Sequence, residues 1–573
     1  MKRLFDILSV FLLITGIMVL GESIIYPQPS EYGPAILNWG PNVKYGGTVK
    51  YIDTYGKITL NFNPFSTTAI PTVNLVYEPL FFVNLADVIT PMLGTSYKWT
   101  DNNLELIVTT RQGVKWSDGV PFTAKDVAFT FNYIKAHPSI DTSGVWSPSF
   151  SKLQTVEASG DTTVIFKFSS PQTALFYTIV GLDIIPEHIW GTIQDPSKYV
   201  DTNPVGTGPF MYKEGSFNAA NNSLTMVKNP NYWMKGRPYV DAVYYLSSSN
   251  TSYILMQLLQ HNFDWSNLGS GIDPTKLFVD KDPSANVAYW LPINTNELYF
   301  NTQKYPFNIP AFRKAIALVI NRHKCLEDAY FNMFPVINPL GILPQQAAEW
   351  QDPALDNLIS TFKYDPQEAE KILASAGFKK NSSGDLCGPN GKPLPTFRIL
   401  VGAGWGDYIA QAEIIEQGLK LLGISAVTDQ QVWAPYMSSF MSGTYDMGIC
   451  WGNGTGAVPY TFYYSEFNPA FSASKIGEIA VSDFSRYTNP LITAALQVYS
   501  ETSNLRLQKQ AIYTIERIFL DDVPFVPLTN EGGFGEFVTT QFTGWPSSSA
   551  PYVYQVPMDS RQAEMVALNV HLK

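Results

Sequence analysis

The chain has little charge and little cysteine for its length. Charged residues make up 15% of its 573 residues, and its three cysteines are Cys325, Cys387 and Cys450. An odd number of scattered cysteines argues against a disulfide framework and a paired CxxC metal site, so we expect these thiols to be buried. With 38 Lys and Arg against 49 Asp and Glu, and no basic run, no nucleic-acid partner is expected, because nucleic-acid affinity depends on clustered Lys and Arg.

Signatures of catalytic and cofactor sites are also missing. The chain has five widely separated histidines, none in an HExxH pair: His137, His188, His261, His323 and His571. No GxSxG nucleophile elbow occurs. The stretch Gly402–Gly406 imitates a dinucleotide fingerprint, but Asp407 stands where its third glycine would be, so we expect Asp407 to cap the following helix. These absences predict a protein that is not an enzyme and holds no metal and no cofactor.

Apolar runs long enough to cross a membrane are absent after the N-terminus. There, Lys2 and Arg3 precede an apolar run from Ile7 to Leu20, and small and polar residues follow it. This order is typical of a secretory signal peptide over residues 1–21. An uncleaved anchor is the alternative, although the run is short for a membrane span. We expect a protein secreted across the cytoplasmic membrane, with a periplasmic or cell-surface location.

What the chain does have is length and aromatic residues. A chain of 573 residues, 45% of them hydrophobic, is too long for one core, so two to four domains are expected. Aromatic residues make up 14% of the chain, including 13 Trp and 32 Tyr. Part of this aromatic content suits a site that stacks on the faces of a ligand.

Local patterns predict several elements. A strand over residues 104–110 leads to a tight turn at Asp118-Gly119, after which Thr123 and Asp126 are spaced as a capping box for a helix over 124–136. A strand over 397–401, a helix over 408–422 and a strand over 424–427 predict a βαβ unit. We also expect a helix near residues 72–79 and an irregular lead-in over residues 22–45.

The segment Gln112–Val127 resembles a signature of the large solute-binding proteins of ABC importers. This is extracellular solute-binding protein family 5, whose members bind oligopeptides, dipeptides, nickel or cello-oligosaccharides. The resemblance runs from about residue 46 to the C-terminus. Further segments that resemble the family occur in the family's order: Tyr77–Leu80, Thr207–Phe210, Lys228–Trp233, the helix from Pro310, and Asp365–Phe378.

This resemblance implies an α/β, two-lobed periplasmic-binding-protein-like fold of type II (large cluster) with an extra inserted domain. Domain I would consist of residues 22–83, 202–296 and 536–573. Domain II, the insertion, would cover residues 84–201, and domain III would cover residues 297–535.

The segment Gly443–Gly454 bears on the choice of ligand. Peptide-binding members have GTxD, an apolar strand, a Trp and then an Asp that pairs with the α-amino group of the ligand. This chain keeps Asp446 and Trp451 but has Asn453 where that Asp is expected. Because an ammonium group buried without a counter-charge is costly, a neutral oligosaccharide fits this segment better than a peptide does.

Family position also implies which residues face the cleft. Core packing is the alternative for each aromatic residue among them. From domain III these residues are Trp405, Trp433, Tyr436, Trp451, Gly452, Asn453 and Gly454. From domain I they are Thr68 and Ile70, with Trp265 and Trp290 as further candidates.

The resemblance implies a monomer that closes its lobes on a small oligosaccharide and delivers it to the transmembrane permease subunits of an ABC importer. Oligopeptide capture is the alternative, and binding without transport stays open. A secreted glycoside hydrolase is an alternative from another class. It requires a carboxylate pair in the cleft, and the adjacent Asp521-Asp522 would point to opposite faces of a strand.

Overall fold

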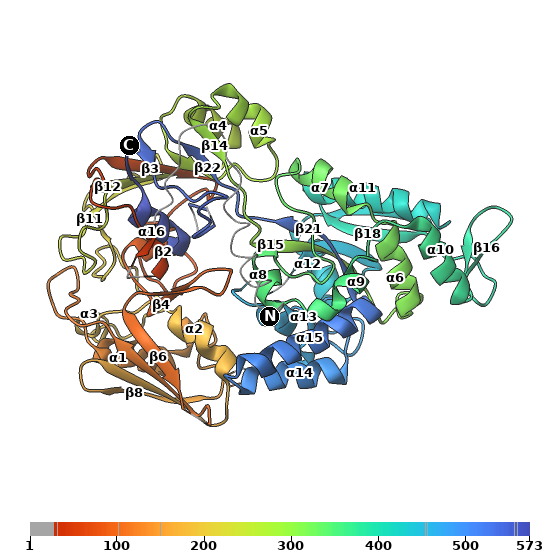
Figure 1. The fold of residues 1–573 in the computed structure, drawn as a ribbon, viewed down its shortest axis with the longest axis horizontal. Coiled ribbons are helices and arrows are strands. Elements are labelled where there is room, and N and C mark those ends of the chain that lie inside the picture. Colours follow the sequence, from red (N-terminus) through yellow and green to blue (C-terminus); the bar gives the residue numbers. More distant parts are fainter. Residues whose placement is uncertain are drawn as a thin grey trace, which may run out of the picture.

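Two lobes make up the molecule, as Figure 1 shows for the computed structural model of the chain. The structure describes residues 28–30, 33–100, 102–148, 151–452, 454, 456–554, 556–557 and 560–573, so the predicted signal peptide lies outside the described residues. Over this described part, no helix combines the length and the hydrophobicity that a membrane crossing requires.

A seven-stranded mixed sheet forms the centre of the first lobe. Strand β3 pairs in parallel with β12 and β13, and the other pairs are antiparallel. Helix α16 (Ser560–Asn569), close to the C-terminus, packs against β2 (Gly33–Asn38). The strand order is β10 (Phe210–Tyr212), β11 (Ser223–Lys228), β12 (Ala242–Ser247), β3 (Thr48–Asp53), β13 (Trp265–Ser266), β22 (Glu536–Val538) and β14 (Asn286–Ala288).

Below this sheet in Figure 1 lies a four-stranded antiparallel sheet with helix α1 (Ala124–Ala136). Helix α1 has the predicted bounds and the predicted capping box, in which Asp126 Oδ2 accepts the backbone N–H of Thr123 at 2.9 Å. Helix α2 (Phe176–Val180) lies on the side of this part that faces the second lobe. The strand order is β6 (Gly94–Trp99), β7 (Glu105–Thr110), β9 (Thr163–Phe168) and β8 (Leu153–Ser159).

The second lobe is built on a five-stranded sheet. Its strand order is β19 (Ala426–Gln431), β18 (Phe397–Gly402), β20 (Met447–Trp451), β15 (Asn294–Phe300) and β21 (Phe525–Glu531). Strands β19 and β20 pair in parallel with β18, and α11 connects β18 to β19, which confirms the predicted βαβ unit. The helices include α6 (Pro310–Val319), α7 (Arg322–Tyr330), α8 (Pro344–Trp350), α10 (Pro366–Ser375), α11 (Gly406–Leu421), α12 (Trp433–Ser442), α13 (Pro459–Phe467), α14 (Pro490–Glu501) and α15 (Leu505–Asp522).

Two antiparallel chain segments connect the lobes. Residues 289–293 lead from β14 to β15 and residues 532–535 lead from β21 to β22, with the N–H of Tyr289 donating to the Gly535 carbonyl at 2.9 Å. The rings of Trp290 and Phe534 lie 4.7 Å apart across this connection. Gly533 has φ of 63° and a Cβ there would lie 2.0 Å from the Leu291 carbonyl oxygen, so the close pairing of the two segments requires glycine.

Two predicted local structures are wrong. The lead-in expected to be irregular contains β2, which pairs with β1 (Gln28–Ser30). The helix expected near residues 72–79 is only a 3-10 turn over Val73–Leu75. A continuing helix would need the Val76 carbonyl for its own ladder, but that carbonyl accepts the N–H of Gly208 at 2.8 Å. The three cysteines are buried and unpaired, as predicted.

Buried carboxyl groups give the fold a dependence on pH. Burial raises the pKa of Glu297 and of Glu516 from 4.5 to about 8, and that of Glu536 to about 7. Between these values and 4.5 the folded chain holds protons that the unfolded chain has released. The contribution of these groups to stability is therefore fully present below about pH 4.5 and is lost as the pH rises through 7 and 8.

We expect the thermal unfolding midpoint to be lower at about pH 8.5 than at about pH 6, because ionising these buried carboxyls costs free energy only in the folded state. Glu297→Gln should weaken this dependence, because the amide does not ionise. The variant should still fold, because the amide oxygen can accept the hydrogen bond that the Thr295 hydroxyl donates to Glu297 at 2.6 Å. The exposed Glu413→Gln is the matched control. A midpoint that rises over this range in the natural chain would contradict the expectation.

Candidate ligand-binding site

Three tryptophans meet at one edge of the second lobe's sheet. Trp405 follows β18, Trp433 follows β19, and Trp451 ends β20. Because β19 and β20 are both parallel to β18, the carboxyl ends of the three strands lie at the same edge, where α/β sheets commonly bind ligands. The rings of Trp433 and Trp451 are 5.8 Å apart and inclined by 11°, and Trp405 lies 6.1 Å from Trp433. We call these three residues the aromatic edge.

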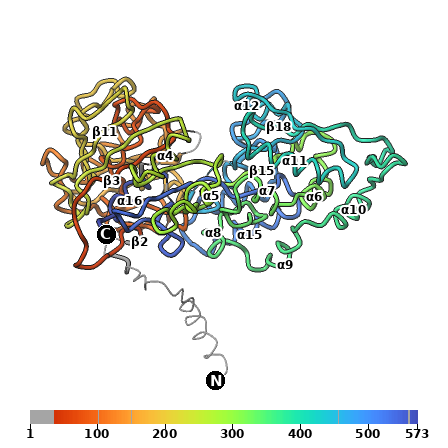
Figure 2. The backbone as a smooth tube through the Cα atoms, turned by 90° about the horizontal axis from the view of Figure 1, so that it is seen from above, coloured from red at the N-terminus to blue at the C-terminus, as the bar shows by residue number. Residues whose placement is uncertain are grey.

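The aromatic edge is open to solvent. Trp433 is 57% exposed, and Trp405 and Trp451 are partly exposed. Figure 2 shows α12, which begins at Trp433, on the side of the second lobe turned toward the first lobe. Exposed indole faces in this position can stack on the apolar faces of a ligand that enters between the lobes.

Other predicted aromatic contacts are buried. Tyr436 is fully buried, its hydroxyl donates to the Ile449 carbonyl at 2.7 Å, and its ring supports Trp405 at 5.2 Å. Trp265 is fully buried in the core of the first lobe, 4.6 Å from the Tyr51 ring. Trp290 packs in the connection between the lobes and donates from Nε1 to Glu536 at 2.8 Å. The predicted contact of these three side chains with a ligand is therefore replaced by packing.

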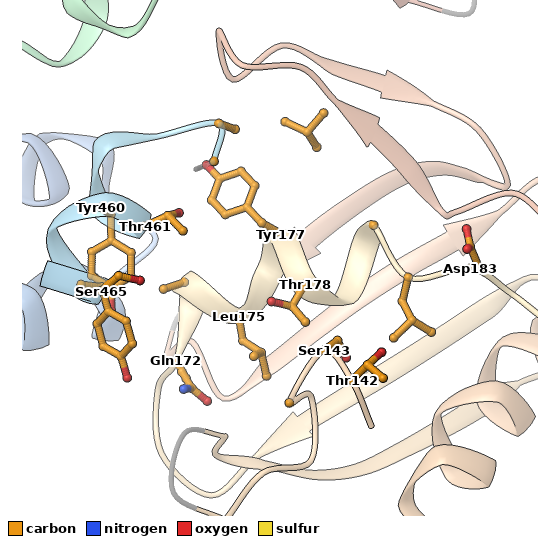
Figure 3. Close-up of a pocket in the computed structure, with 18 of the residues that line it drawn as sticks. Thr142, Ser143, Gln172, Leu175, Tyr177, Thr178, Asp183, Tyr460, Thr461 and Ser465 are labelled. Carbon is orange, nitrogen blue, oxygen red and sulfur yellow. The ribbon is translucent and has the colours of Figure 1, made fainter. Parts of the chain in front are cut away.

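A cavity of about 760 Å³ lies between the lobes, and Figure 3 shows residues that line it. We call it the interlobe cavity. Both lobes contribute to its lining, the first lobe mainly with residues 134–183 and the second lobe mainly with one face of α13. These lining residues include Pro64, Phe65, Gln172, Leu175, Tyr177 and Thr178 from the first lobe, and Gly456, Tyr460, Thr461, Tyr464 and Ser465 from the second.

Direct hydrogen bonds join the two lobes near the interlobe cavity. The Thr173 hydroxyl, just before α2, donates to the Thr502 carbonyl, just after α14, at 2.7 Å. The Ser503 hydroxyl donates to Asn103 Oδ1 at 2.6 Å. The two lobes therefore touch here as well as through the connecting segments.

The lining of the interlobe cavity is neutral overall. Among the described lining residues the charged side chains are Asp183 and Arg561, which pair with each other at 3.3 Å. Asn74 also donates to Asp183, at 2.7 Å. The remaining polar lining consists mainly of hydroxyl groups of Ser, Thr and Tyr, which both donate and accept hydrogen bonds. Such a lining can hold an uncharged ligand that carries many hydroxyl groups.

The segment after β20 connects the aromatic edge to the interlobe cavity. Gly452 is buried, and Gly456 lines the cavity. Gly454 has φ of 89°, and a Cβ there would lie 2.5 Å from the Thr461 carbonyl oxygen, so the backbone of Gly454 lies tightly against α13. Asn453, on which the sequence-based choice of ligand depends, lies outside the described residues.

The loop that leads to the 3-10 turn over Val73–Leu75 contributes different residues from those predicted. Pro64 and Phe65 line the interlobe cavity. Thr68 is exposed and accepts a hydrogen bond from Asn61 Nδ2 at 3.2 Å, whereas Ile70 is 1% exposed and packs in the core. Burial of Ile70 follows from the turn of this loop, in which the Ile70 N–H donates to the Asn61 carbonyl at 2.8 Å.

Sequence reasoning missed the lining residues of α2 and α13. On α13 a signal was present, because Tyr460, Thr461, Tyr464 and Ser465 recur at helical spacing and so share one face. On α2 the local sequence carries no such signal, since only the contact with the second lobe decides which face lines the cavity. Asp407 is not the helix cap that was predicted: it lies in the first turn of α11, and Trp405 occupies the N-cap position.

Comparison with protein families gives one match that covers most of the chain. The model described as "Bacterial extracellular solute-binding proteins, family 5 Middle" matches residues 88–473. The oligopeptide-binding protein AppA of Bacillus subtilis is 23% identical over 426 residues, which cover 72% of this chain and 75% of AppA. Heme-binding protein A of Haemophilus influenzae is 25% identical over 502 residues, covering 82% and 85%.

Solved structures share the fold. A periplasmic oligopeptide-binding protein of an oligopeptide ABC transporter from Thermotoga maritima has a TM-score of 0.80 at 28% identity, covering 92% of this chain and 99% of that one. Its structure with bound mannohexaose has a TM-score of 0.71 at 29% identity, covering 92% and 98%. AppA of Bacillus subtilis in complex with a nonapeptide has a TM-score of 0.64 at 20% identity, covering 93% and 100%.

Proposed function

Because this chain belongs to the bacterial extracellular solute-binding proteins of family 5, we propose that the ligand it captures for an ABC importer is a small oligosaccharide. The chain is a substrate-binding protein with the two-lobed fold of its relatives. A ligand that contacts both lobes stabilises the closed form in proportion to its preference for that form, and the permease subunits receive the ligand from it.

The neutral lining of the interlobe cavity is the observation that most supports a sugar. A pyranose offers hydroxyl groups for the Thr461, Ser465 and Thr178 side chains and apolar C–H faces for aromatic rings. The aromatic edge supplies such rings at the end of the segment that leads into the cavity. The Thermotoga maritima relative with bound mannohexaose, 29% identical to this chain, is consistent with this class of ligand.

An oligopeptide is the second candidate, because several relatives are named for oligopeptides and one fold neighbour holds a nonapeptide. A peptide would bring an ammonium and a carboxylate group, and the two charged groups of the described lining already pair with each other. Breaking that pair to bind a peptide would leave buried charges to be neutralised again.

Catalysis of glycoside hydrolysis is not part of the proposed function. Asp183 is the sole carboxylate among the described residues that line the interlobe cavity, and hydrolysis uses two. Asp521 and Asp522 lie at the end of α15 instead of on a strand, and neither lines the cavity. The relatives named above are binding proteins as well.

The proposed role places the chain outside the cytoplasmic membrane as a monomer. In this role the first lobe comprises domain I, residues 22–83, 202–296 and 536–573, with domain II inserted over residues 84–201. Domain III, residues 297–535, corresponds to the second lobe, so ligand would bind where all three domains meet.

Titration calorimetry of the protein without residues 1–21 tests the ligand class, using β-linked and α-linked oligosaccharides and a mixture of peptides. We expect heat of binding from an oligosaccharide and no hydrolysis products, because the cavity offers hydroxyl groups and aromatic rings without a free charge. Binding of peptides alone would overturn the proposal.

Replacing Trp433 by Ala should weaken oligosaccharide binding about threefold to tenfold, because one exposed stacking face of the aromatic edge is lost. Calorimetry with the best sugar of the panel measures this change. Tyr364→Ala is the matched control, since Tyr364 is also exposed, at 46%, but lies just before α10. Equal affinities of the two variants would show that the aromatic edge does not contact the ligand.

Replacing Thr178 by Trp should fill part of the interlobe cavity, because Thr178 lies on α2 and lines it. We expect the affinity for the longest bound oligosaccharide to fall about tenfold, and the affinity for a disaccharide to fall less. Thr514→Trp, on the exposed face of α15, is the control. If the affinities for both sugars fell by the same factor, the interlobe cavity would not be the place where the additional residues of a longer oligosaccharide bind.

A further inference from the structure

A group of polar side chains lies beneath the aromatic edge, at the point where the second lobe meets the connecting segments. Tyr330, the last residue of α7, is fully buried, and its hydroxyl lies 3.2 Å from Asp407 Oδ2 and 3.2 Å from Glu531 Oε2. Asn296 Nδ2 donates to the same hydroxyl at 2.7 Å. Glu531 ends β21 and directly precedes the connecting segment 532–535.

The hydrogen bonds at Tyr330 require one proton more than the tyrosine supplies. A hydroxyl group has a single hydrogen, so Tyr330 can donate to only one of the two carboxyl groups. The other contact needs a hydrogen on the carboxyl itself, which then donates to the tyrosine oxygen. Two ionised carboxylates on this hydroxyl would leave one of the contacts unsatisfied and would repel each other.

The surroundings assign this proton to Glu531. Asp407 already accepts two other hydrogen bonds: from the backbone N–H of Tyr408 at 3.0 Å, and from the Ser270 hydroxyl at 3.1 Å. It also lies in the first turn of α11, where a negative charge is stabilised. With these donors around it, Asp407 needs no hydrogen of its own to satisfy its oxygens, so the geometry leaves the extra hydrogen to Glu531.

The bond from Ser270 to Asp407 crosses from one lobe to the other. Ser270 lies in the loop after β13 of the first lobe, whereas Asp407 belongs to the second lobe. This loop is held in place by Glu536, which accepts the N–H of Leu268 at 2.8 Å and also the Trp290 side chain. The contact between the lobes is therefore anchored on both sides.

We propose that a single proton, held by Glu531 and bonded to Tyr330, stabilises the contact of the lobes at Ser270 and Asp407, so that lobe closure is coupled to proton uptake. Loss of this proton places a second negative charge beside Asp407. Separation of the lobes at this contact exposes the charged groups to water, which favours the open form at alkaline pH. In its effect on ligand affinity, this coupling rests on the proposed function.

The groups around Glu531 agree with a proton held near neutral pH. Burial, with a further contribution from the Asp407 carboxylate, raises the pKa of Glu531 to about 8. The neighbouring titratable groups Tyr330, Tyr408, Tyr436 and Cys450 have their pKa raised by burial and stay uncharged there. Two further carboxyl groups titrate in the same range: burial raises the pKa of Glu297, which also interacts with Glu531, to about 8, and that of Glu536, which holds the Ser270 loop, to about 7. Glu531→Gln leaves both of these groups in place, so it separates their effect from that of Glu531. Within the described residues, no Lys, Arg or His forms an ion pair with Asp407 or Glu531, so no cation offsets the second charge.

Small-angle X-ray scattering of the ligand-free protein tests the coupling without any assumption about the ligand. We expect the radius of gyration to increase between about pH 7 and pH 9 in the natural chain, and to stay at its lower value in Glu531→Gln, whose amide is uncharged at every pH. Glu413→Gln, an exposed substitution, should behave as the natural chain does, and thermal unfolding shows whether each variant is folded.

Calorimetry provides the second arm. With the best oligosaccharide of the panel, affinity should be about tenfold weaker at pH 9 than at pH 7 in the natural chain and unchanged in Glu531→Gln, as one coupled proton requires. A radius of gyration with the same pH dependence in the natural chain and in folded Glu531→Gln would overturn the coupling. If that dependence differs as expected but no sugar binds, the proposed ligand class fails and the coupling stands.

Discussion

The pairing of two short backbone segments is the constraint on which the rest of the structure depends. The connecting segments 289–293 and 532–535 are hydrogen-bonded to each other and form the covalent link between the two central sheets. The two backbones approach each other so closely that a Cβ at residue 533 would collide with the Leu291 carbonyl oxygen, so only glycine is compatible with this link. The rings of Trp290 and Phe534, one from each segment, pack against each other and add an apolar contact to this link. Any change in the angle between the lobes must be taken up within these few residues.

The candidate site uses both lobes, and for that reason it is complete only at certain lobe angles. The aromatic edge belongs wholly to the second lobe, where three parallel strands fix its tryptophans. The interlobe cavity instead takes α2 from one lobe and α13 from the other. A ligand that reaches both the aromatic edge and the interlobe cavity contacts rings of fixed position at one end. At its other end it contacts a lining whose shape depends on the angle between the lobes. Its binding energy can therefore be converted into closure.

Helices and strands with strong local patterns could be predicted from the sequence. Whether a single aromatic residue faces the cleft or packs in the core could not be predicted. Helix α1 formed with its capping box because Thr123 and Asp126 interact within one turn. The βαβ pattern predicted the two parallel strands after which Trp405 and Trp433 lie, whereas Trp451, the last residue of β20, was placed at the cleft by the family resemblance. By contrast, Trp265 and Trp290 are surrounded by residues distant in sequence, such as Tyr51 and Phe534, so their burial depends on tertiary packing. The α2 contribution to the cavity was missed for the same reason.

The course of the chain through the first lobe sets the order in which the protein can fold. Asn569 accepts the N–H of Leu37 at 2.9 Å and donates to the Ala35 carbonyl at 2.8 Å, so the two ends of the chain complete one core together. The second lobe is continuous from β15 to β21 and can form as soon as it has been synthesised. The first lobe cannot complete its core before Asn569 in α16 is available. The two lobes are therefore expected to fold in a fixed order, the second before the first, although the first begins earlier in the sequence.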